Sequence, residues 1–219
     1  MKTTFLALFV TLTYWVMGQG LPKSTNLENQ IIHHTAYTLS YNESHEQADW
    51  VTYRVTKIEL ENDVAKRKDN FTVDTCIVTG SAQLLDYKNS GYDKGHLAPA
   101  ATFVDNQKEM DESFLMSNMS PQNPSFNRGV WKRLEDYERK MAIEKDTVYV
   151  ICGPVLTEGL KTIGPNKVSI PKLYFKIIYY KDWMVCFILS NRKSNEPLYT
   201  FEKSLGVVEK ITKIDFFVE

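Results

Sequence analysis

The sequence predicts an α+β fold in which a central, mostly antiparallel sheet is flanked by helices. Stretches rich in β-branched and aromatic residues at 147–156 and 173–190 are typical of central strands, and YKDW at 180–183 indicates a hairpin turn in the second. Strand-like and helix-like segments do not alternate strictly, as they would in a doubly wound parallel sheet. With 219 residues, 43% hydrophobic and 24% charged, the chain suits one globular domain.

The other elements follow from local periodicity. A strand is expected at 50–60, because Val51, Tyr53 and Val55 alternate onto one face. A short helix is expected at 106–115. Apolar residues from Val130 to Met141 recur at steps of three and four, which predicts a long amphipathic helix at 127–142. A third helix at 204–212 precedes a strand-like segment at 214–217.

The first 20 residues have the pattern of a secretory signal peptide. Lys2 precedes an apolar run from Phe5 to Met17, and small residues follow at the end of that run. The alternative is a buried N-terminal strand or helix. No other segment is long and apolar enough to span a membrane, so no membrane association is expected after signal removal. Residues 21–36 are polar and mixed, which predicts a loose leader before a domain at 37–219, in a protein secreted to the extracellular space or the periplasm.

Charge and cysteine content exclude some function classes. A formal net charge of −1 means that any polyanion would have to bind a local basic patch. Three cysteines leave at least one thiol unpaired. Cys152 and Cys186 lie in strand-like runs and are expected to be small buried hydrophobes, although one disulfide with undetermined partners remains open. There is no Cys-x-x-Cys pair to indicate a zinc site of that kind.

The stretch GYDKGHLAPA at 91–100 contains the first candidate for catalysis, His96. Gly91 and Gly95 allow a sharp turn or a close backbone approach, which would set the imidazole at a defined angle. A neutral imidazole near physiological pH can take a proton from water. From this stretch alone, a hydrogen-bonded core histidine is the commoner alternative.

A second candidate lies at the start of the long predicted helix. Prolines and asparagines at 121–124 force irregular backbone, and Asn127 follows them. An asparagine there is usually a helix cap. Glu135 is eight residues further on, about 12 Å of rise and roughly 80° of rotation, so the two side chains are expected on one side of the helix. An amide and a distant carboxylate suit Mg²⁺, which keeps most of its waters.

Basic residues accompany both candidates. Lys94 precedes His96, Lys66 to Lys68 form a short run, and three cations, Arg128, Lys132 and Arg133, follow Asn127. Charge runs are usually solvated surface, but this placement in an acidic chain predicts a phosphate-binding cleft.

The stretch GYDKGHLAPA, together with FLMSNMSPQNPSFNRGVWKRLE at 114–135, resembles the DNA/RNA non-specific endonuclease family, whose active site is a ββα-metal (His-Me finger) motif. The hallmark of that family is Asp-Arg/Lys-Gly-His, followed about thirty residues later by a metal-binding asparagine. Asn127 stands 31 residues after His96. Further segments resemble the family in the expected order, so the likeness covers about residues 37–217.

The resemblance implies roles for the candidate residues. His96 fills the position of the general base, Asn127 that of the sole protein ligand to the metal, and Glu135 an outer position that orients bound water. The implied cofactor is Mg²⁺, with Mn²⁺ as a substitute. The implied activity is metal-dependent, sequence-non-specific cleavage of DNA and/or RNA to 5′-phosphate and 3′-hydroxyl ends. Together with the signal peptide expected at residues 1–20, it describes an exported endonuclease.

Two further positions and two departures complete the comparison. Arg67 best matches the arginine that contacts the phosphate, with Lys66 as its rival, and Asn118 matches a further active-site asparagine. Thr102 stands where many members carry an acidic residue, and Lys213 stands where a glycine usually ends the last helix.

Three questions stay open at this level: preference for DNA or RNA, monomer or homodimer, and activity itself. The main alternative is a secreted nucleic-acid-binding protein that keeps the fold with little or no turnover. An unrelated metalloprotease is disfavoured because there is no His-Glu-x-x-His, and His33 and His34 are expected at the surface.

Overall fold

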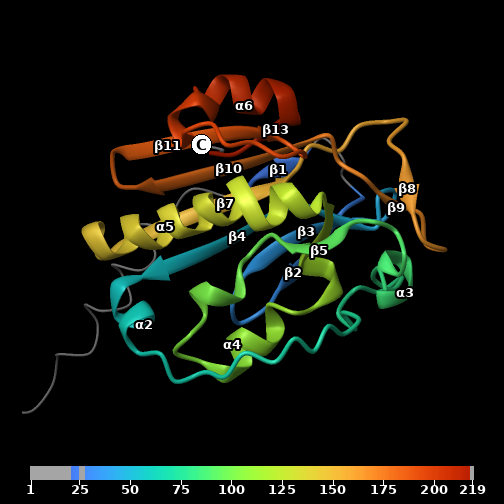
Figure 1. Cartoon of the computed structure of the whole chain (residues 1–219), viewed down its shortest axis with the longest axis horizontal. Helices are drawn as coiled ribbons and strands as arrows, with labels where there is room; N and C mark the ends of the chain where they lie inside the picture. The colour runs from blue at the N-terminus through green and yellow to red at the C-terminus, as the bar shows by residue number, and fades with distance from the viewer. Residues whose placement is uncertain (1–20, 25–27, 218–219) are drawn as a thin grey trace, which may run out of the picture.

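The computed structural model describes residues 21–24 and 28–217 (Figure 1). Its centre is a seven-stranded sheet in the order β12-β11-β10-β7-β4-β3-β2, with every neighbouring pair antiparallel. The strands are β2 (Gln30–His33), β3 (Thr38–Asn42), β4 (Gln47–Thr56), β7 (Thr147–Pro154), β10 (Leu173–Tyr180), β11 (Trp183–Ser190) and β12 (Glu202–Lys203). The predicted α+β class with a mostly antiparallel sheet is therefore confirmed.

Helices and three short strand pairs surround this sheet. The α-helices are α2 (Lys57–Glu61), α3 (Leu84–Tyr87), α4 (Gln107–Glu112), α5 (Lys132–Lys145) and α6 (Leu205–Thr212). Single turns are η1 (Ala100–Thr102), η2 (Met116–Asn118), the π-helical η3 (Phe126–Trp131) and η4 (Leu198–Phe201). The strand pairs are β1 (Lys23–Ser24) with β13 (Ile214–Asp215), β5 (Asp93–His96) with β6 (Met119–Gln122), and β8 (Thr162–Ile163) with β9 (Val168–Ser169).

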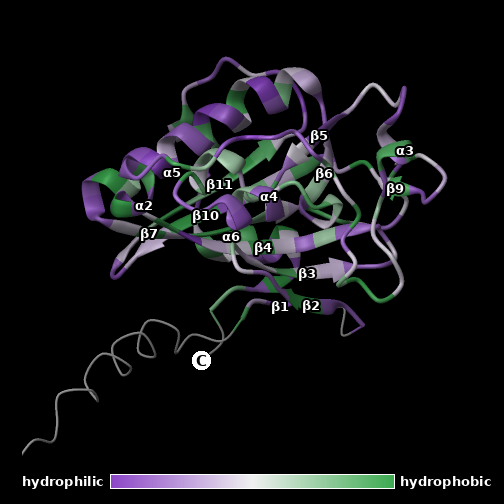
Figure 2. Ribbon diagram, turned by 90° about the horizontal axis from the view of Figure 1, so that it is seen from below, coloured by the Kyte–Doolittle hydropathy of each residue, from purple (hydrophilic) through white to green (hydrophobic). Residues whose placement is uncertain are grey.

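The two faces of the sheet have separate hydrophobic cores. Along β4, Val51 and Tyr53 belong to the cluster that contains Leu134 of α5. Trp50 belongs to the cluster that contains Val208 of α6. This alternation, predicted from the sequence, places α5 and α6 on opposite faces (Figures 1 and 2). Hydrophobic residues follow the strands between the helices, whereas hydrophilic residues dominate the outer turns (Figure 2).

Two predicted boundaries are wrong. The strand expected at 50–60 ends at Thr56, whose hydroxyl accepts a hydrogen bond from the amide of Glu59 (3.2 Å) and so caps α2. The segment 21–36 is no loose leader, because Gln30–His33 pairs with β3 along its whole length. The predicted signal peptide, residues 1–20, lies outside the described residues.

The helix expected at 127–142 differs in its first turn. Residues Phe126–Trp131 form a π-helical turn in which Gly129 has non-helical angles (φ −111°, ψ −106°), and the regular α-helix begins at Lys132. The rise and rotation calculated for a regular α-helix therefore do not relate Asn127 to Glu135. The expected helices at 106–115 and 204–212 are present as α4 and α6. Lys213 ends α6 in the left-handed conformation (φ 61°) that favours glycine.

The cysteines behave as small apolar side chains where they are buried. Cys152 and Cys186 are both buried and free, as expected, and Cys76 is free and exposed. Within the described residues, no helix is long and apolar enough to cross a bilayer.

An ion pair ties α5 to the middle of the sheet. Lys176 of β10 donates from Nζ to Oε2 of Glu138 on α5, and both side chains are 0% exposed. The Tyr53 hydroxyl donates to the same carboxylate (3.0 Å to each oxygen), and the Lys176 ammonium lies 4.8 Å from the centre of the Trp131 ring. Burial is the largest influence and lowers the pKa of Lys176, but the combined effects of Glu138, Cys152 and Glu135 raise it above its usual value.

Removing one member of this pair should cost more than removing both. We expect Lys176→Met to lower the free energy of unfolding by about 3–5 kcal/mol, because it leaves the Glu138 carboxylate buried without a counter-charge. The double variant Lys176→Met/Glu138→Gln should recover much of that loss. Urea unfolding of the three proteins measures both effects. A single variant as stable as the parent would show that the pair does not hold α5.

Candidate active site

A ββα arrangement brings the sequence candidates together. Strands β5 and β6 pair with His96 opposite Met119, and η3 and α5 follow β6 directly. Asn127 donates from Nδ2 to Oδ2 of Asp93 (3.0 Å), and Trp131 donates from Nε1 to the backbone oxygen of His96 (3.1 Å). The helical turn is thus attached to both ends of β5, which places Asn127 beside the strand that carries the histidine.

Both glycines of the motif have a steric reason. Gly91 has a positive φ of 80°, which side chains other than glycine rarely adopt. A Cβ built on Gly95 would lie 2.2 Å from the Cδ atom of Gln122 on the paired strand. Close contact between β5 and the buried Gln122 side chain therefore requires glycine immediately before His96.

The His96 ring lies in a partly apolar setting. It makes edge contacts with Phe114 (ring centres 4.9 Å apart) and a tilted contact with Phe71 (5.8 Å). Its Nε2 atom is buried and has no hydrogen-bond partner among the described residues. An unpaired ring nitrogen in an otherwise well-packed structure is available to a ligand or to water. This contrasts with the hydrogen-bonded core histidine that was the alternative.

Burial and positive charge keep this imidazole neutral. Burial is the largest influence, and the charges of Arg67 and Lys94 add to it against an opposing effect of Asp69, lowering the pKa of His96 to about 3. A neutral imidazole is the form that accepts a proton. The same environment that lowers the pKa also weakens the base, so the geometry favours proton transfer only beside an acidified water or substrate.

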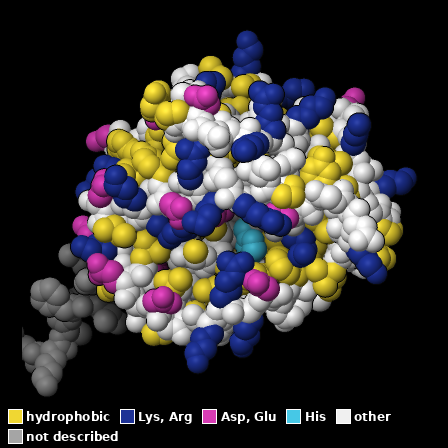
Figure 3. All heavy atoms as spheres, viewed as in Figure 1, with side chains coloured by type: hydrophobic (Ala, Val, Ile, Leu, Met, Phe, Trp, Pro, Cys, Tyr) yellow, Lys and Arg dark blue, Asp and Glu magenta, His cyan; other side chains and the backbone are white. Residues whose placement is uncertain are grey.

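Arg67 and Lys94 border the ring. The exposed Arg67 guanidinium lies 5.3 Å from the centre of the Phe114 ring and donates from Nε to Oδ1 of Asp69 (2.8 Å). Lys94 places its ammonium 4.6 Å from the centre of the Phe71 ring. Arg67 therefore shares an aromatic contact with His96, which favours it over Lys66 as the phosphate contact. On this face of the molecule, a histidine side chain lies in a hollow among Lys and Arg side chains (Figure 3).

Asn127 does not cap the helix. Its amide nitrogen is used by Asp93, which also receives two hydrogen bonds from Arg128 (Nε 2.9 Å, Nη2 2.7 Å). The amide oxygen of Asn127 accepts no hydrogen bond from any described residue. Asp93 therefore orients the amide and leaves its oxygen atom available as a ligand for a cation.

Glu135 supplies a second oxygen group without a partner. It forms no hydrogen bond or ion pair within the described part of the chain. Burial raises its pKa to about 7; Lys176 opposes this shift, and Glu138 adds to it. An amide oxygen and a carboxylate are the hard ligands that Mg²⁺ prefers, so Asn127 and Glu135 fit such an ion as direct ligand and outer group.

Asn118 has a different position from that of a substrate contact. The buried side chain accepts a hydrogen bond from the amide of Ala98 (2.9 Å) and donates to the carbonyls of Ala98 (2.9 Å) and Ser113 (2.8 Å). Its amide oxygen and its amide nitrogen are both hydrogen-bonded to the backbone, so Asn118 positions the segment that follows His96. Thr102 is also buried, and its hydroxyl lies 3.4 Å from the Glu138 carboxylate. Thr102, which stands where many family members carry an acidic residue, thus lies next to the buried ion pair of Glu138 and Lys176.

Sequence reasoning missed three contributors to this site. Asp93 stands in the stretch GYDKGHLAPA, but the sequence does not reveal that its carboxylate accepts a hydrogen bond from Asn127. The periodicity predicts only that Trp131 belongs to the apolar face of the helix, whereas its indole N–H donates to the backbone oxygen of His96. Phe114 opens the second quoted motif, but its contact with both His96 and Arg67 exists only in the folded chain.

A second group of potential ligands lies elsewhere. One ligand atom from each of His34, Asp74 and Cys76 falls within 4.8 Å of the others. The Asp74 carboxylate already accepts hydrogen bonds from His34 Nε2 (2.9 Å), Ser117 Oγ (2.6 Å) and the Cys76 amide (2.9 Å). His34 is 6% exposed, so the expected surface position of this histidine is wrong.

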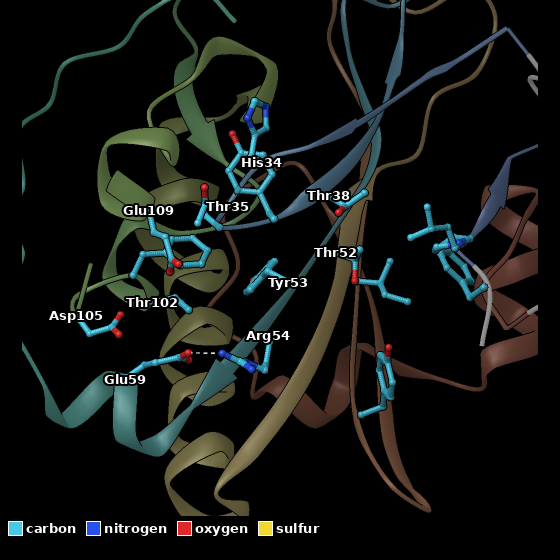
Figure 4. Close-up of a pocket in the computed structure, with 18 of the residues that line it drawn as sticks. His34, Thr35, Thr38, Thr52, Tyr53, Arg54, Glu59, Thr102, Asp105 and Glu109 are labelled. Carbon is cyan, nitrogen blue, oxygen red and sulfur yellow. Dashed lines mark hydrogen bonds and ion pairs between the residues drawn. The ribbon is translucent and has the colours of Figure 1, made fainter. Parts of the chain in front are cut away.

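His34 also lines a pocket separate from His96. Its other walls include Tyr53, Asp105, Glu109 and the ion pair of Arg54 with Glu59 (Figure 4). None of His96, Asn127 and Glu135 lines this pocket. The candidate catalytic residues therefore lie outside this pocket.

Comparisons with known proteins agree with the site. The family described as DNA/RNA non-specific endonuclease matches residues 20–219. The chain is 36% identical to a nuclease from Nostoc sp. over 163 residues, which covers 74% of this chain and 58% of the relative. It is 34% identical to human mitochondrial endonuclease G, covering 73% of this chain and 56% of the relative.

Other comparisons extend over more of the chain. A nuclease from Syncephalastrum racemosum is 34% identical, covering 86% of this chain and 68% of the relative. A protein chain in a crystal structure of an EndoG/EndoGI complex superposes with a TM-score of 0.83 at 30% identity, covering 94% of this chain and 91% of that one. The chain spans little more than half the length of several of these relatives. It belongs to the DNA/RNA non-specific endonuclease family.

Proposed function

We propose that the chain is a metal-dependent, sequence-non-specific endonuclease that hydrolyses DNA and/or RNA to 5′-phosphate and 3′-hydroxyl ends. The observation that carries this proposal is the arrangement around β5. The neutral imidazole of His96, whose Nε2 has no partner among the described residues, stands at one end of β5. Asn127 is bonded to Asp93 at the other end of the same strand, and Arg67 shares the Phe114 ring with His96. Family membership supports the reaction class.

Each side chain has a defined task in this mechanism. His96 accepts a proton from the attacking water. Arg67 binds a non-bridging oxygen of the phosphate and stabilises the negative charge that grows during attack. Asn127 and Glu135 would hold Mg²⁺, or Mn²⁺ as a substitute, and the bound cation supplies Lewis-acid stabilisation of the phosphate and the departing oxygen. Asp93 fixes the Asn127 amide, and Trp131 and Asn118 hold the backbone of His96 and of Ala98, which follows it.

The substrate range follows from what these groups touch. All the proposed contacts are to the phosphodiester backbone, which carries no direct sequence information. The chain should therefore cut with little sequence preference. None of the described residues to which we assign a role contacts the 2′-hydroxyl, so both nucleic acids are included in the proposal.

We also propose that the protein is exported, on the strength of residues 1–20. Some named relatives are mitochondrial, so location varies among proteins of this kind. Mass determination of the N-terminus of protein recovered from a culture medium decides this point. Recovery only inside cells with Met1 intact would contradict export.

The proposed roles of His96 and Asn127 are tested by plasmid digestion. We expect His96→Ala and Asn127→Ala to reduce the rate about 10²–10⁴-fold while the proteins stay folded, since a positioned base contributes about that much. Chelation by EDTA should stop the parent enzyme. Ligation of the products without added kinase reports 5′-phosphate ends.

His33→Ala is the matched control, because His33 is exposed and bonds only to Thr38 within the described residues. It should cut at the parental rate. Parental activity of His96→Ala would show that another group is the base. Binding of plasmid by the parent without cleavage would favour the non-catalytic alternative.

The lowered pKa of His96 has consequences for pH. Its imidazole should remain neutral from pH 8 down to about 4, as ¹⁵N chemical shifts of the metal-free protein would report. The unfolded chain binds this proton near pH 6.5, so protonation favours unfolding, and this contribution lowers the stability progressively between pH of about 6.5 and about 3. His96→Gln should flatten that part of the stability profile. Titration of the folded imidazole near pH 6.5 would contradict the buried, cation-flanked environment.

A further inference from the structure

A second recess lies at the N-terminal side of β5. It has a volume of about 560 Å³, within the range that holds a nucleotide-sized ligand. Tyr92, which directly precedes β5, forms one wall, and the loops at the ends of β10 and β11 form others. These loops lie at the end of the sheet where β8 and β9 are found (Figure 1).

Three exposed cations surround this recess. They are Lys161, Lys172 and Arg192, and no Asp or Glu is among the described residues that line the recess. Within the described residues, none of the three lies within ion-pair distance of a carboxylate, whereas several basic groups around β5 and α5, such as Arg67, Arg128 and Lys132, do. Uncompensated positive charge around a concave surface attracts a polyanion.

Hydrogen bonds join this recess to the candidate active site. Asn191, in its wall, donates from Nδ2 to the carbonyls of Pro121 (3.0 Å) and Pro171 (2.9 Å). Its Oδ1 accepts from the amide of Asn123 (2.8 Å), and the carbonyl of Asn123 in turn accepts from the amide of Asn127 (2.9 Å). The wall of the recess and the turn that carries Asn127 are thus one connected unit.

The separation of the two sites suits a continuous strand. Tyr92 precedes His96 by four residues on an extended segment, which corresponds to about 13 Å. A nucleic-acid strand advances about 3.4 Å per nucleotide in a helix, so about four nucleotides span this distance, and fewer do so if the strand is extended.

We propose that the recess is a second subsite for the substrate, in which Lys161, Lys172 and Arg192 bind phosphates of a single-stranded segment a few nucleotides from the bond that is cut. Tyr92 is partly exposed in the wall and offers a ring on which an unpaired base stacks. This inference rests on the proposed nuclease function and adds that single-stranded substrate is gripped at two places.

The test measures binding without turnover. In a His96→Ala background, the triple variant Lys161→Gln/Lys172→Gln/Arg192→Gln is compared with its parent by fluorescence anisotropy. The probes are fluorescein-labelled single-stranded oligodeoxynucleotides of 4 and 12 nucleotides. We expect the triple variant to lose up to about 100-fold in affinity for the 12-mer at 0.1 M salt, and its salt dependence (log K against log salt) to be shallower by about 2. Affinity for the 4-mer should change little.

A matched control separates local contacts from total charge. Lys140→Gln/Lys145→Gln/Lys181→Gln removes the same charge at the end of α5 and at the turn between β10 and β11, at the opposite end of the sheet (Figure 1). This control should bind both probes as the parent does. Equal losses in the two triple variants, or equal losses for both probe lengths, would overturn the subsite.

A second variant tests the aromatic wall. Tyr92→Leu keeps apolar packing but lacks the stacking ring, and should lose about 5–100-fold in affinity for the 12-mer, with no comparable loss for a 12-base-pair duplex. If the cation variant weakens duplex binding equally and Tyr92→Leu has no effect, the recess binds a duplex backbone and the single-strand proposal fails. Plasmid digestion by the unmodified protein is measured separately, so loss of the nuclease proposal and loss of the subsite give different results.

Discussion

The buried pair of Lys176 and Glu138 is the constraint on which the site depends. Neither charge can remain buried alone without a large free-energy cost, so β10 and α5 are held in one relative position. Glu135 lies one helical turn before Glu138, and Trp131, which contacts the Lys176 ammonium, also binds the backbone of His96. The position of α5 on the sheet therefore helps to determine where Glu135 lies relative to the strand that carries His96.

Burial acts in opposite directions on the two titrating groups of the site. It lowers the pKa of His96 and raises that of Glu135, because in each case it disfavours the charged form. The protein at rest thus holds a neutral base and a carboxyl group that ionises near neutrality. A bound cation would favour the ionised form of Glu135, and a bound phosphate would favour the protonated form of His96. Ligand binding would therefore be coupled to the protonation of both groups.

Prediction from the sequence succeeded where local pattern determines structure. The alternation of Val51, Tyr53 and Val55, the hairpin turn before Trp183 and the helix at 204–212 need only near neighbours. The placement of Asn127 beside the strand of His96 was predictable because both residues stand in long motifs. Contacts across the fold were not: His34 pairs with Asp74 forty residues away, and Asn118 is used up by Ala98 and Ser113. The short strand Gln30–His33 is stabilised by pairing with β3, which its own mixed composition does not reveal.

The π-helical turn at Phe126–Trp131 makes the length of this segment as important as its composition. The backbone is kinked there at Gly129, whose angles are non-helical. Deleting one residue between Asn127 and Trp131 would rotate the two side chains by about 100° relative to each other. The amide of Asn127 would then lose its hydrogen bond to Asp93, while the indole of Trp131 would keep its hydrogen bond to the backbone of His96. The spacing of this segment therefore constrains the position of the Asn127 amide as much as the residue type does.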